Sequence, residues 1–379
     1  MSEAAAVRPK VALFASNFLP YSQTFIFDEI ARPRRYGVEV FAVQRQHADR
    51  FPFEPVHVGD WRYRRLNYQP EFARRLRGGG FALVHAHFGV GGARAAPFAR
   101  AAGLPLVITF HGYDVPLLTS VHRWQPEYLG YALTAAKTVR EDMTLGLCAS
   151  EELYEMLRDY GVPAARLRLY RLGIDLAKFA PGRRGGEVPE VIAIGRFVEK
   201  KGFEYAIRAV GDQVRRGARL RFTIVGDGDR EARLRALVAE LGLAAHTTFT
   251  GALPAAEVQA RLRGADILLA PSVTAADGDR ESGLIVVKEA SASAVVPIGT
   301  WHGGIHEIID DGVTGFLVPE RNVTVLSDRL GRLLRDPALR ATLGAAARAK
   351  MEREYDLRDR LAALDDHYDE AVALGPQES

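Results

Sequence analysis

The sequence predicts an α/β protein made of two similar domains, each built around a mostly parallel sheet. Short apolar runs that resemble strands alternate with helical patterns through the first half of the chain, and the alternation restarts in the second half. Such alternation is typical of βαβ units, whose strands pair in parallel. Between the halves lies the polar segment 180–190, APGRRGGEVPE, whose two prolines and three glycines indicate a linker.

The individual strands are predicted from apolar runs that end in Gly, Ser, Asn or His and lead toward a helical pattern. In the first half these runs cover residues 10–16, 38–43, 82–88, 104–112 and 145–150. In the second half they cover residues 191–196, 221–228, 247–253, 266–272 and 295–300. Ligands of such sheets bind at the carboxyl ends of the strands, so the loops after these runs should carry the site.

The domain boundaries follow from the linker and from the C-terminal tail. We expect an N-terminal Rossmann-like domain over residues 1–180 and a C-terminal Rossmann-like domain over residues 181–354. From about Tyr355 the chain alternates leucine, alanine and charged residues, which predicts a final surface helix over residues 355–379. We expect this helix to pack back on the N-terminal domain.

Composition limits the classes of function. Among 379 residues, 47% are hydrophobic and 26% are charged, which is ordinary for a soluble protein. The net charge of +3 is too small to predict a nucleic-acid partner. A single cysteine, Cys148, fits a reducing compartment. We find neither a signal peptide nor an apolar run long enough to span a bilayer, so we expect a cytoplasmic protein, either free or peripheral on the inner face of the membrane.

Residues 195–207, GRFVEKKGFEYAI, combine a glycine turn, cations and the predicted start of a helix. Gly195 turns after a strand, Arg196 follows it, and Lys200 and Lys201 stand before the next glycine. Cations beside a glycine turn and a helix N-terminus form a site for a diphosphate. The alternative is a solvated basic loop. Of the two lysines we choose Lys201 as the ligand and expect Lys200 to face water.

Three histidines lie at or near the ends of predicted strands. We expect His85 and His87 to point to opposite faces of one strand, where they could not hold one metal ion. One of them would then be a core or cleft-lining histidine. His111 ends an apolar strand and precedes Gly112, so its side chain can face a ligand, although a structural role fits the local sequence equally well.

Two glutamates, Glu281 and Glu289, bracket a mostly apolar segment in DRESGLIVVKEASA. We expect Glu281 on a polar loop and a helix that opens at Gly283, with Glu289 nearly two turns inside it. The backbone N–H groups at a helix start attract phosphate, and carboxylates accept hydrogen bonds from sugar hydroxyls. The alternative is an ordinary helix with an acid on the preceding loop, and the spacing alone does not exclude it.

Two further glycine-rich segments follow predicted strands. IVGDGDREARL, residues 224–234, lacks the third glycine of a dinucleotide fingerprint, so we interpret it as a strand-to-helix turn. GTWHGGIHEIIDDGVTGFLVP, residues 299–319, has paired glycines that let the backbone approach a ligand. Its alternative interpretation is a tight turn followed by a hairpin-like GVTGFLVP.

The motifs together resemble glycosyltransferase family 4, the retaining sugar-nucleotide-dependent transferases of GT-B fold. In the second half the resemblance rests on GRFVEKKG, IVGDG, FTGALPAAEV, ADILLAPS, E-x7-E, HGGIHEII and DGVTGFLVP, in that order. In the first half it rests on NFLPYSQTFI, HAHFG, TFHGYDV, CASEEL and RLGIDLAKF. These resemble members that build exopolysaccharide and lipopolysaccharide, and nearly the whole chain is covered. The GT-B fold implies two Rossmann-like domains that face each other across a cleft.

The resemblance implies roles for the residues of the second half. Arg196 and Lys201, after the turn at Gly195, would bind the donor diphosphate and stabilise it as it leaves. Glu281 would hold hydroxyls of the donor sugar, and Glu289 would take the ribose hydroxyls. The backbone amides implied to face phosphate and sugar are those of Gly283, Leu284 and Ile285.

In the first half the resemblance implies that His111 contacts the donor sugar near the reacting carbon, while Ser22 and Thr24 line the acceptor side. The chain departs from the family pattern in having Ser-Gly-Leu-Ile after Glu281, where Gly-Leu-Pro is usual. It also has Ala294 where glycine is common, and the proline is shifted to Pro297. These departures concern loop geometry more than the class of reaction.

The implied reaction moves a sugar from a UDP- or GDP-sugar to a glycan or lipid-linked acceptor with retention of configuration. The acceptor hydroxyl would attack on the face that the phosphate leaves, so the protein acts by positioning and charge stabilisation. We see no clear acidic metal cluster and expect neither a metal nor another cofactor. Two rival functions with the same fold are a sugar-nucleotide 2-epimerase and a non-catalytic sugar-nucleotide-binding protein.

The segment 61–77, WRYRRLNYQPEFARRLR, carries six arginines, one glutamate and interleaved aromatics. Such a segment can attract anionic lipid headgroups or an anionic lipid-linked acceptor. A solvated basic helix face is the slightly favoured alternative.

Overall fold

The structure is a computed structural model and describes residues 8–19, 24–126, 128–182, 188–276, 278–281 and 283–377. The chain divides into two compact units. Unit 1 contains Met1–Gly173 together with Leu357–Ser379, and unit 2 contains Ile174–Asp356. The boundary between Gly173 and Ile174 therefore precedes the polar segment 180–190. Within that segment, residues 183–187 lie outside the described part of the chain.

Unit 1 contains a parallel sheet of seven strands in the order β3-β2-β1-β4-β5-β6-β7. The strands are β1 (Lys10–Phe18), β2 (Gly37–Arg45), β3 (Val56–Val58), β4 (Phe81–His87), β5 (Leu106–Phe110), β6 (Leu145–Cys148) and β7 (Leu167–Leu169). The five strands expected from the sequence are confirmed. Strands β3 and β7 were not expected, because three residues are too few to show a strand period.

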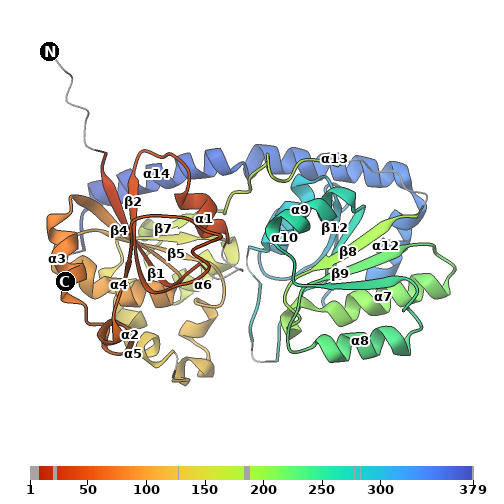
Figure 1. The fold of residues 1–379 in the computed structure, drawn as a ribbon, viewed down its shortest axis with the longest axis horizontal. Helices are drawn as coiled ribbons and strands as arrows, with labels where there is room; N and C mark the ends of the chain where they lie inside the picture. The colour runs from red at the N-terminus through yellow and green to blue at the C-terminus, as the bar shows by residue number, and fades with distance from the viewer. Residues whose placement is uncertain are drawn as a thin grey trace, which may run out of the picture. The chain divides into compact units, whose positions relative to one another are not determined.

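Helices cover both faces of this sheet (Figure 1). One face carries α1 (Thr24–Ile30) and the C-terminal helix α14 (Leu357–Leu374). On the other face the core is formed with α3 (Pro70–Gly78), α4 (Gly89–Ala102), α5 (Leu129–Lys137) and α6 (Glu151–Asp159). The short helix α2 (Trp61–Leu66) is capped by Asp60. Helix α4 can lie close to the sheet because a side chain at Gly92 would overlap that of Ile108.

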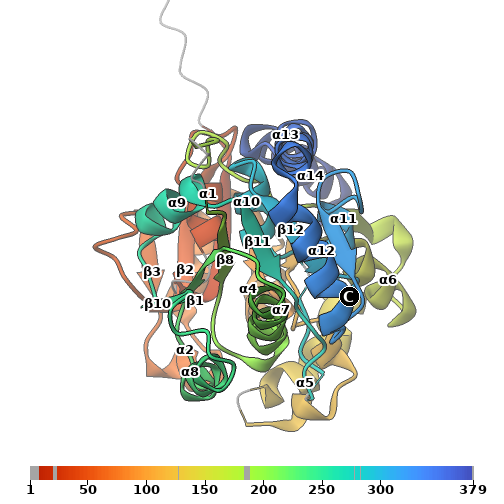
Figure 2. The ribbon, with the colours of Figure 1, turned by 90° about the vertical axis from the view of Figure 1, so that its right-hand side faces the viewer.

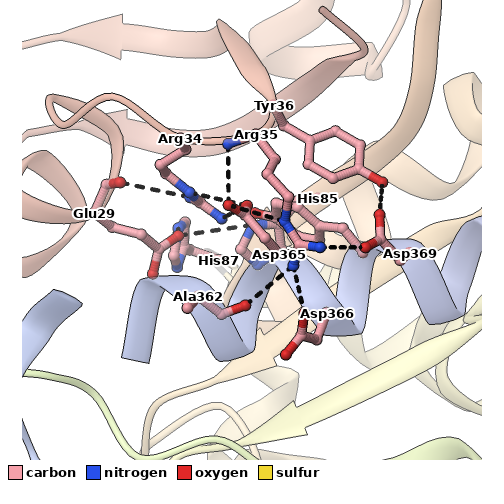
Figure 3. Close-up of polar contacts among 11 residues, drawn as sticks. Glu29, Arg34, Arg35, Tyr36, His85, His87, Ala362, Asp365, Asp366 and Asp369 are labelled. Atoms are coloured by element: carbon pink, nitrogen blue, oxygen red, sulfur yellow. Dashed lines mark hydrogen bonds and ion pairs between the residues drawn. The ribbon is translucent and has the colours of Figure 1, made fainter. Parts of the chain in front are cut away.

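The C-terminal helix returns to unit 1 through a buried ion pair (Figure 3). The guanidinium of Arg34 donates from Nε and Nη2 to Asp365 Oδ1 over 3.1 and 2.7 Å, and the backbone N–H of Arg35 donates to Oδ2. Burial alone would lower the pKa of Arg34, but Tyr368, Glu29 and Asp365 outweigh it and raise that pKa. Asp365 is therefore the anionic partner that a buried, permanently charged guanidinium requires.

Unit 2 contains a parallel sheet of six strands in the order β10-β9-β8-β11-β12-β13. The strands are β8 (Glu190–Ile194), β9 (Arg221–Val225), β10 (Thr247–Gly251), β11 (Ile267–Ala270), β12 (Val296–Thr300) and β13 (Phe316–Val318). The five expected strands are again confirmed. The hairpin-like interpretation of GVTGFLVP is wrong, since its apolar part is β13, which pairs in parallel with β12.

Two layers of helices enclose the sheet of unit 2 (Figures 1 and 2). One core layer involves α7 (Phe203–Arg215), α8 (Glu231–Glu240) and α12 (Val323–Arg335). The other involves α9 (Ala255–Gly264), α10 (Ile285–Ala292) and α13 (Pro337–Glu354), and α11 (Ile305–Ile308) follows β12. Within the described residues, no helix is both long and apolar enough to cross a membrane.

Candidate functional site

The candidate site of unit 2 lies where four neighbouring parallel strands end. Strands β8, β11, β12 and β13 are adjacent in the sheet, so the loops that follow them emerge at one edge. The loop after β8 carries Lys200 and Lys201, and the loop after β11 carries Glu281. His302 follows β12 and Glu320 follows β13. The fold thus gathers cations, carboxylates and a histidine that are far apart in the sequence.

Lys201 and Glu281 form a partly buried ion pair in which the Nζ–Oε1 distance is 3.1 Å. Lys201 ends a 3₁₀ turn, Glu199–Lys201, which is closed by Gly202 in the left-handed conformation at φ 62°. A side chain at Gly202 would collide with the carbonyl oxygen of Pro271, so only glycine lets the two loops approach this closely. The glycine after the lysine therefore positions the pair.

From the sequence we expected Lys200 to face water, but the structure places it against two carboxylates. Its ammonium lies 3.0 Å from Asp279 Oδ1 and 3.5 Å from Glu281 Oε1. Its side chain is 13% exposed, against 17% for Lys201. The expectation was wrong because the loop after β11 folds back over the 3₁₀ turn, and sequence spacing does not reveal that contact. Two ammonium groups therefore act on one carboxylate.

The charged groups of this cluster shift each other's pKa values. Burial alone would raise the pKa of Glu281, but the ammonium groups of Lys201 and Lys200 outweigh burial and bring that pKa below its ordinary value. Burial lowers the pKa of Lys201, and Glu281 opposes this shift. The carboxylate is therefore ionised at neutral pH and can accept hydrogen bonds from hydroxyl groups.

Gly195 and Arg196 precede this cluster. The extended side-chain stem of Lys201 lies over Gly195, where an added Cβ would be 3.4 Å from Cδ and Cε of the lysine. Arg196 is exposed, and its charge contributes to the lowered pKa of Lys201. The structure thus places Gly195 against the side chain of Lys201 and Arg196 within electrostatic reach of it.

Helix α10 begins later than predicted. Its first residue is Ile285, with Leu284 at the N-cap, so Gly283 precedes the helix instead of opening it. Glu289 is the fifth helical residue, about one turn inside rather than nearly two. No capping side chain marks this start, which explains the misplaced boundary. Leu284 is buried, whereas Gly283, Ile285 and Glu289 are half-buried.

Sequence reasoning missed His302 and Glu320. His302 Nδ1 lies 2.6 Å from Glu320 Oε1, and the backbone N–H of Glu281 donates to His302 Nε2 over 3.0 Å. Within the glycine-rich segment that contains His302, only the backbone at the paired glycines had a predicted role. The available signal was position: His302 comes directly after β12, the neighbour of β11, and Glu320 comes directly after β13, the neighbour of β12.

In unit 1, His111 follows β5, and its Nε2 lies 2.9 Å from Nδ1 of His87 at the end of β4. The buried carboxylate of Asp114 accepts from the backbone N–H groups of His111, Gly112 and Gly89. Burial raises the pKa of Asp114 although these donors oppose the shift. Asp114, which had no predicted role, therefore fixes the backbone turn that presents His111.

His85 and His87 lie on the same face of β4, contrary to our expectation (Figure 3). Side chains two residues apart on a strand share a face, and it is consecutive residues that alternate. The two rings lie 4.6 Å apart, and Glu29 Oε1 lies 3.4 Å from His87 Nε2 and 3.9 Å from His85 Nδ1. The argument against a shared ion was therefore wrong.

Glu29, His85 and His87 have the composition of a metal site, and their ligand atoms all lie within 4.8 Å of one another. His85, however, already uses both nitrogens: Nε2 contacts Thr109 Oγ1 and Nδ1 contacts Tyr368 Oη, each at 2.8 Å. Without His85 only two ligands remain, fewer than the three protein ligands typical of catalytic zinc. The group is better described as a buried polar network that holds His87.

Of the two residues predicted on the acceptor side, Ser22 lies outside the described residues. Thr24 is the half-buried first residue of α1. The next residue, Phe25, has its ring centroid 4.9 Å from that of His111. The start of α1 therefore lies beside His111 in unit 1.

Comparison with known proteins places this chain among glycosyltransferases. Residues 24–178 match the family model described as Glycosyltransferase Family 4, and residues 177–350 match the model described as Glycosyl transferases group 1.

Three relatives illustrate the sequence similarity. WcaL of Escherichia coli K12, named for colanic acid biosynthesis, is 32% identical over 278 residues, which cover 72% of this chain but only 66% of WcaL. AmsK of Erwinia amylovora, named for amylovoran biosynthesis, is 32% identical over 71% of this chain and 65% of its own length. A GDP-mannose-dependent alpha-(1-6)-phosphatidylinositol monomannoside mannosyltransferase of Mycolicibacterium smegmatis is 32% identical over 71% of each chain.

Solved structures show the same fold at lower identity. Alr3699/HepE of Anabaena in complex with UDP-glucose superimposes with a TM-score of 0.77 at 18% identity, covering 95% of this chain and 99% of that one. WaaG, a glycosyltransferase involved in lipopolysaccharide biosynthesis, gives a TM-score of 0.69 at 16% identity, covering 94% and 99%. At these identities the similarity shows the fold alone, and it confirms the GT-B architecture.

Proposed function

The chain belongs to glycosyltransferase family 4, and from this premise we propose that it is a retaining, hexosyltransferase-type glycosyltransferase. It would move a sugar from a UDP- or GDP-sugar to a hydroxyl of a glycan or lipid-linked acceptor in cell-surface polysaccharide biosynthesis. The observation that carries the proposal is the partly buried Lys201–Glu281 ion pair at the carboxyl edge of the unit 2 sheet. It supplies a cation for a leaving diphosphate and a carboxylate for sugar hydroxyls in one place.

The donor is held by charge and by hydrogen bonds. Lys201 and Arg196 bind the diphosphate and stabilise the charge that develops as it leaves. Glu281 accepts from hydroxyls of the sugar, and Glu289, one turn into α10, accepts from the ribose. The donor-facing backbone amides are those of Gly283, Leu284 and Ile285.

The transfer step needs little covalent chemistry from the protein. The acceptor hydroxyl attacks the anomeric carbon on the face from which the phosphate leaves, and the departing phosphate takes its proton. His111 contacts the sugar near the reacting carbon, and Thr24 and Ser22 line the acceptor side. Because Lys201 and Arg196 supply the positive charge, we expect turnover without added divalent metal.

The names of the relatives support the choice of donor and pathway. One relative is named as GDP-mannose-dependent, and one structural neighbour was solved with UDP-glucose, so UDP- and GDP-sugars are the first donors to test. Two relatives are named for biosynthesis of the exopolysaccharides colanic acid and amylovoran. Their names support an acceptor in a polysaccharide pathway.

A donor screen tests the proposal. The purified protein is incubated with UDP-, GDP- and ADP-sugars, with and without membrane lipid extract and in the presence of EDTA, and products are followed by mass spectrometry. We expect one nucleotide to be released together with a glycosylated lipid. Interconversion of sugar nucleotides without an acceptor would instead identify a 2-epimerase. Tight binding without any product would identify a binding protein.

The segment 61–77 supports peripheral attachment to the inner face of the cell membrane. In α2 and the turn after it, Trp61, Leu66 and Tyr68 are 66%, 65% and 56% exposed beside the exposed arginines 64 and 65. Exposed aromatics next to cations suit an interface with anionic lipid. We propose that this surface docks on the membrane that carries the acceptor.

Vesicle flotation tests the docking surface. We expect the protein to float with phosphatidylglycerol vesicles at low salt and not to float with neutral vesicles. The variant Arg64→Glu/Arg65→Glu should not bind either kind of vesicle. A matched control reverses two exposed arginines of unit 2, in Arg208→Glu/Arg219→Glu, and should still float. Absence of flotation with anionic vesicles would remove the proposal.

A further inference from the structure

We infer that Glu320 and His302 form a brace that positions the loop carrying Glu281, which makes His302 a positioning residue of the donor site. The inference rests on the proposed function, because Glu281 is assigned there to the donor sugar. It concerns two residues that neither the sequence pattern nor the comparisons assign.

The Glu320 carboxylate joins the start of this loop to His302. Its Oε2 accepts from the backbone N–H of Thr274 over 2.9 Å, and its Oε1 accepts from the Thr274 hydroxyl over 3.3 Å. The same Oε1 lies 2.6 Å from His302 Nδ1. Burial alone would raise the pKa of Glu320, but the bonds from Thr274 and His302 outweigh it and lower that pKa, so the group is an ionised acceptor.

His302 then joins Glu320 to the far end of the loop. The backbone N–H of Glu281 can only donate, and it donates to His302 Nε2 over 3.0 Å. Nε2 therefore carries no proton, and the proton of the neutral ring sits on Nδ1, where it is donated to Glu320. His302 is 1% exposed, so water does not replace either bond. The two bonds together select one tautomer.

The sheet explains why these groups meet. Strands β11, β12 and β13 are consecutive neighbours and run in parallel, so the residues that follow them lie at one edge. The Thr300 hydroxyl at the end of β12 also donates to the carbonyl of Ser272, which fixes the first residues after β11. Thr274 and Glu281 are thus tied to one carboxylate, directly at one end and through His302 at the other.

The brace has a defined consequence for the donor site. The Glu281 backbone is held by His302, and its carboxylate faces Lys201 Nζ at 3.1 Å. Loss of the bond to Nε2 would leave the part-buried N–H of Glu281 without its acceptor and would free the backbone that carries Glu281. Donor binding would then weaken although Lys201 and Glu281 are both still present.

Two conservative variants separate positioning from a merely structural role. In His302→Gln the side-chain amide oxygen can reach the position of Nε2, whereas in His302→Asn the amide nitrogen replaces Nδ1. We expect His302→Gln to keep kcat/KM for the donor within a few-fold and His302→Asn to lower it about tenfold, mostly through KM. If only the anchoring of Glu320 mattered, the order would reverse. His306→Asn, at an exposed position four residues on, is the matched control.

A measurement on the free protein tests the brace without any turnover. Imidazole ¹⁵N NMR should show His302 protonated on Nδ1 and bare on Nε2, with the signal assigned from its loss in His302→Gln. Exchange of the Glu281 amide hydrogen should be protected in the wild type and in His302→Gln, and faster in His302→Asn. A proton on Nε2, or equal exchange in all three proteins, would overturn the brace. If the protein transfers no sugar but shows the predicted His302 tautomer and the predicted exchange of the Glu281 amide, the brace is supported and the proposed function is refuted.

Discussion

Lys201→Ala is expected to lower the rate of sugar transfer about 10²-fold or more, the cost of removing one charge-stabilising donor at a developing negative charge. The Lys201 ammonium lies 3.1 Å from Glu281, on a side chain that is 17% exposed, and belongs to the loop that Gly202 holds against Pro271. Lys200 shares its charge between two carboxylates, since its ammonium lies 3.0 Å from Asp279 and 3.5 Å from Glu281. Initial rates of nucleotide release at saturating donor measure the effect.

Arg208→Gln is the control for Lys201→Ala, since it removes an exposed cation from the next helix, α7, and should keep full activity. The unfolding midpoint of each variant is measured to exclude loss of fold. Wild-type turnover in a folded Lys201→Ala protein would contradict the role assigned to Lys201. Arg196→Ala should also reduce turnover if Arg196 helps to hold the diphosphate.

Asp365→Ala is expected to destabilise unit 1 by about 3–5 kcal/mol, the usual cost of leaving one charge of a buried pair without its partner. The side chains of Arg34 and Asp365 are only 2% and 5% exposed. The carboxylate accepts two bonds from Arg34 and one from the backbone of Arg35. Urea unfolding, monitored through hydrogen exchange of amides in unit 1, measures the change in the free energy of unfolding.

Asp366→Ala provides a matched control on the next residue of the same helix. Asp366 is 72% exposed and pairs with Arg35, which is itself half-exposed. Exposed ion pairs contribute little to stability, so this variant should unfold close to the wild type. Equal unfolding midpoints in Asp365→Ala and Asp366→Ala would contradict the importance of the buried pair.

The sequence predicts the fold well because buried parallel strands are long apolar runs. The ten expected strands are all present, and the C-terminal helix α14 contacts β4 and β5 of unit 1. The strands that were missed or misread, β3, β7 and β13, have three residues each. Whether such a short segment is a strand depends on its pairing with a neighbour, as β13 pairs with β12. A short apolar run does not indicate which strand it pairs with.

The site is predicted only in part, because motifs name residues without giving their contacts. Lys201 and Glu281 were expected to serve one ligand, and the structure brings them together. Lys200 was misplaced because its partners Asp279 and Glu281 come from a loop about 80 residues later. His302 was missed for a similar reason, since its role depends on which strands are neighbours. The opposite faces assigned to His85 and His87 came from a misapplied strand period.

The most direct test of the whole account is nucleotide release by the wild type and by Glu281→Ala, with the donor that the screen identifies and with membrane lipid extract as acceptor. Mass spectrometry follows the nucleotide and the glycosylated lipid together. The account predicts stoichiometric release and transfer by the wild type and loss of both in a folded Glu281→Ala protein. Equal release by the two proteins, or binding of the donor without release by the wild type, would contradict it.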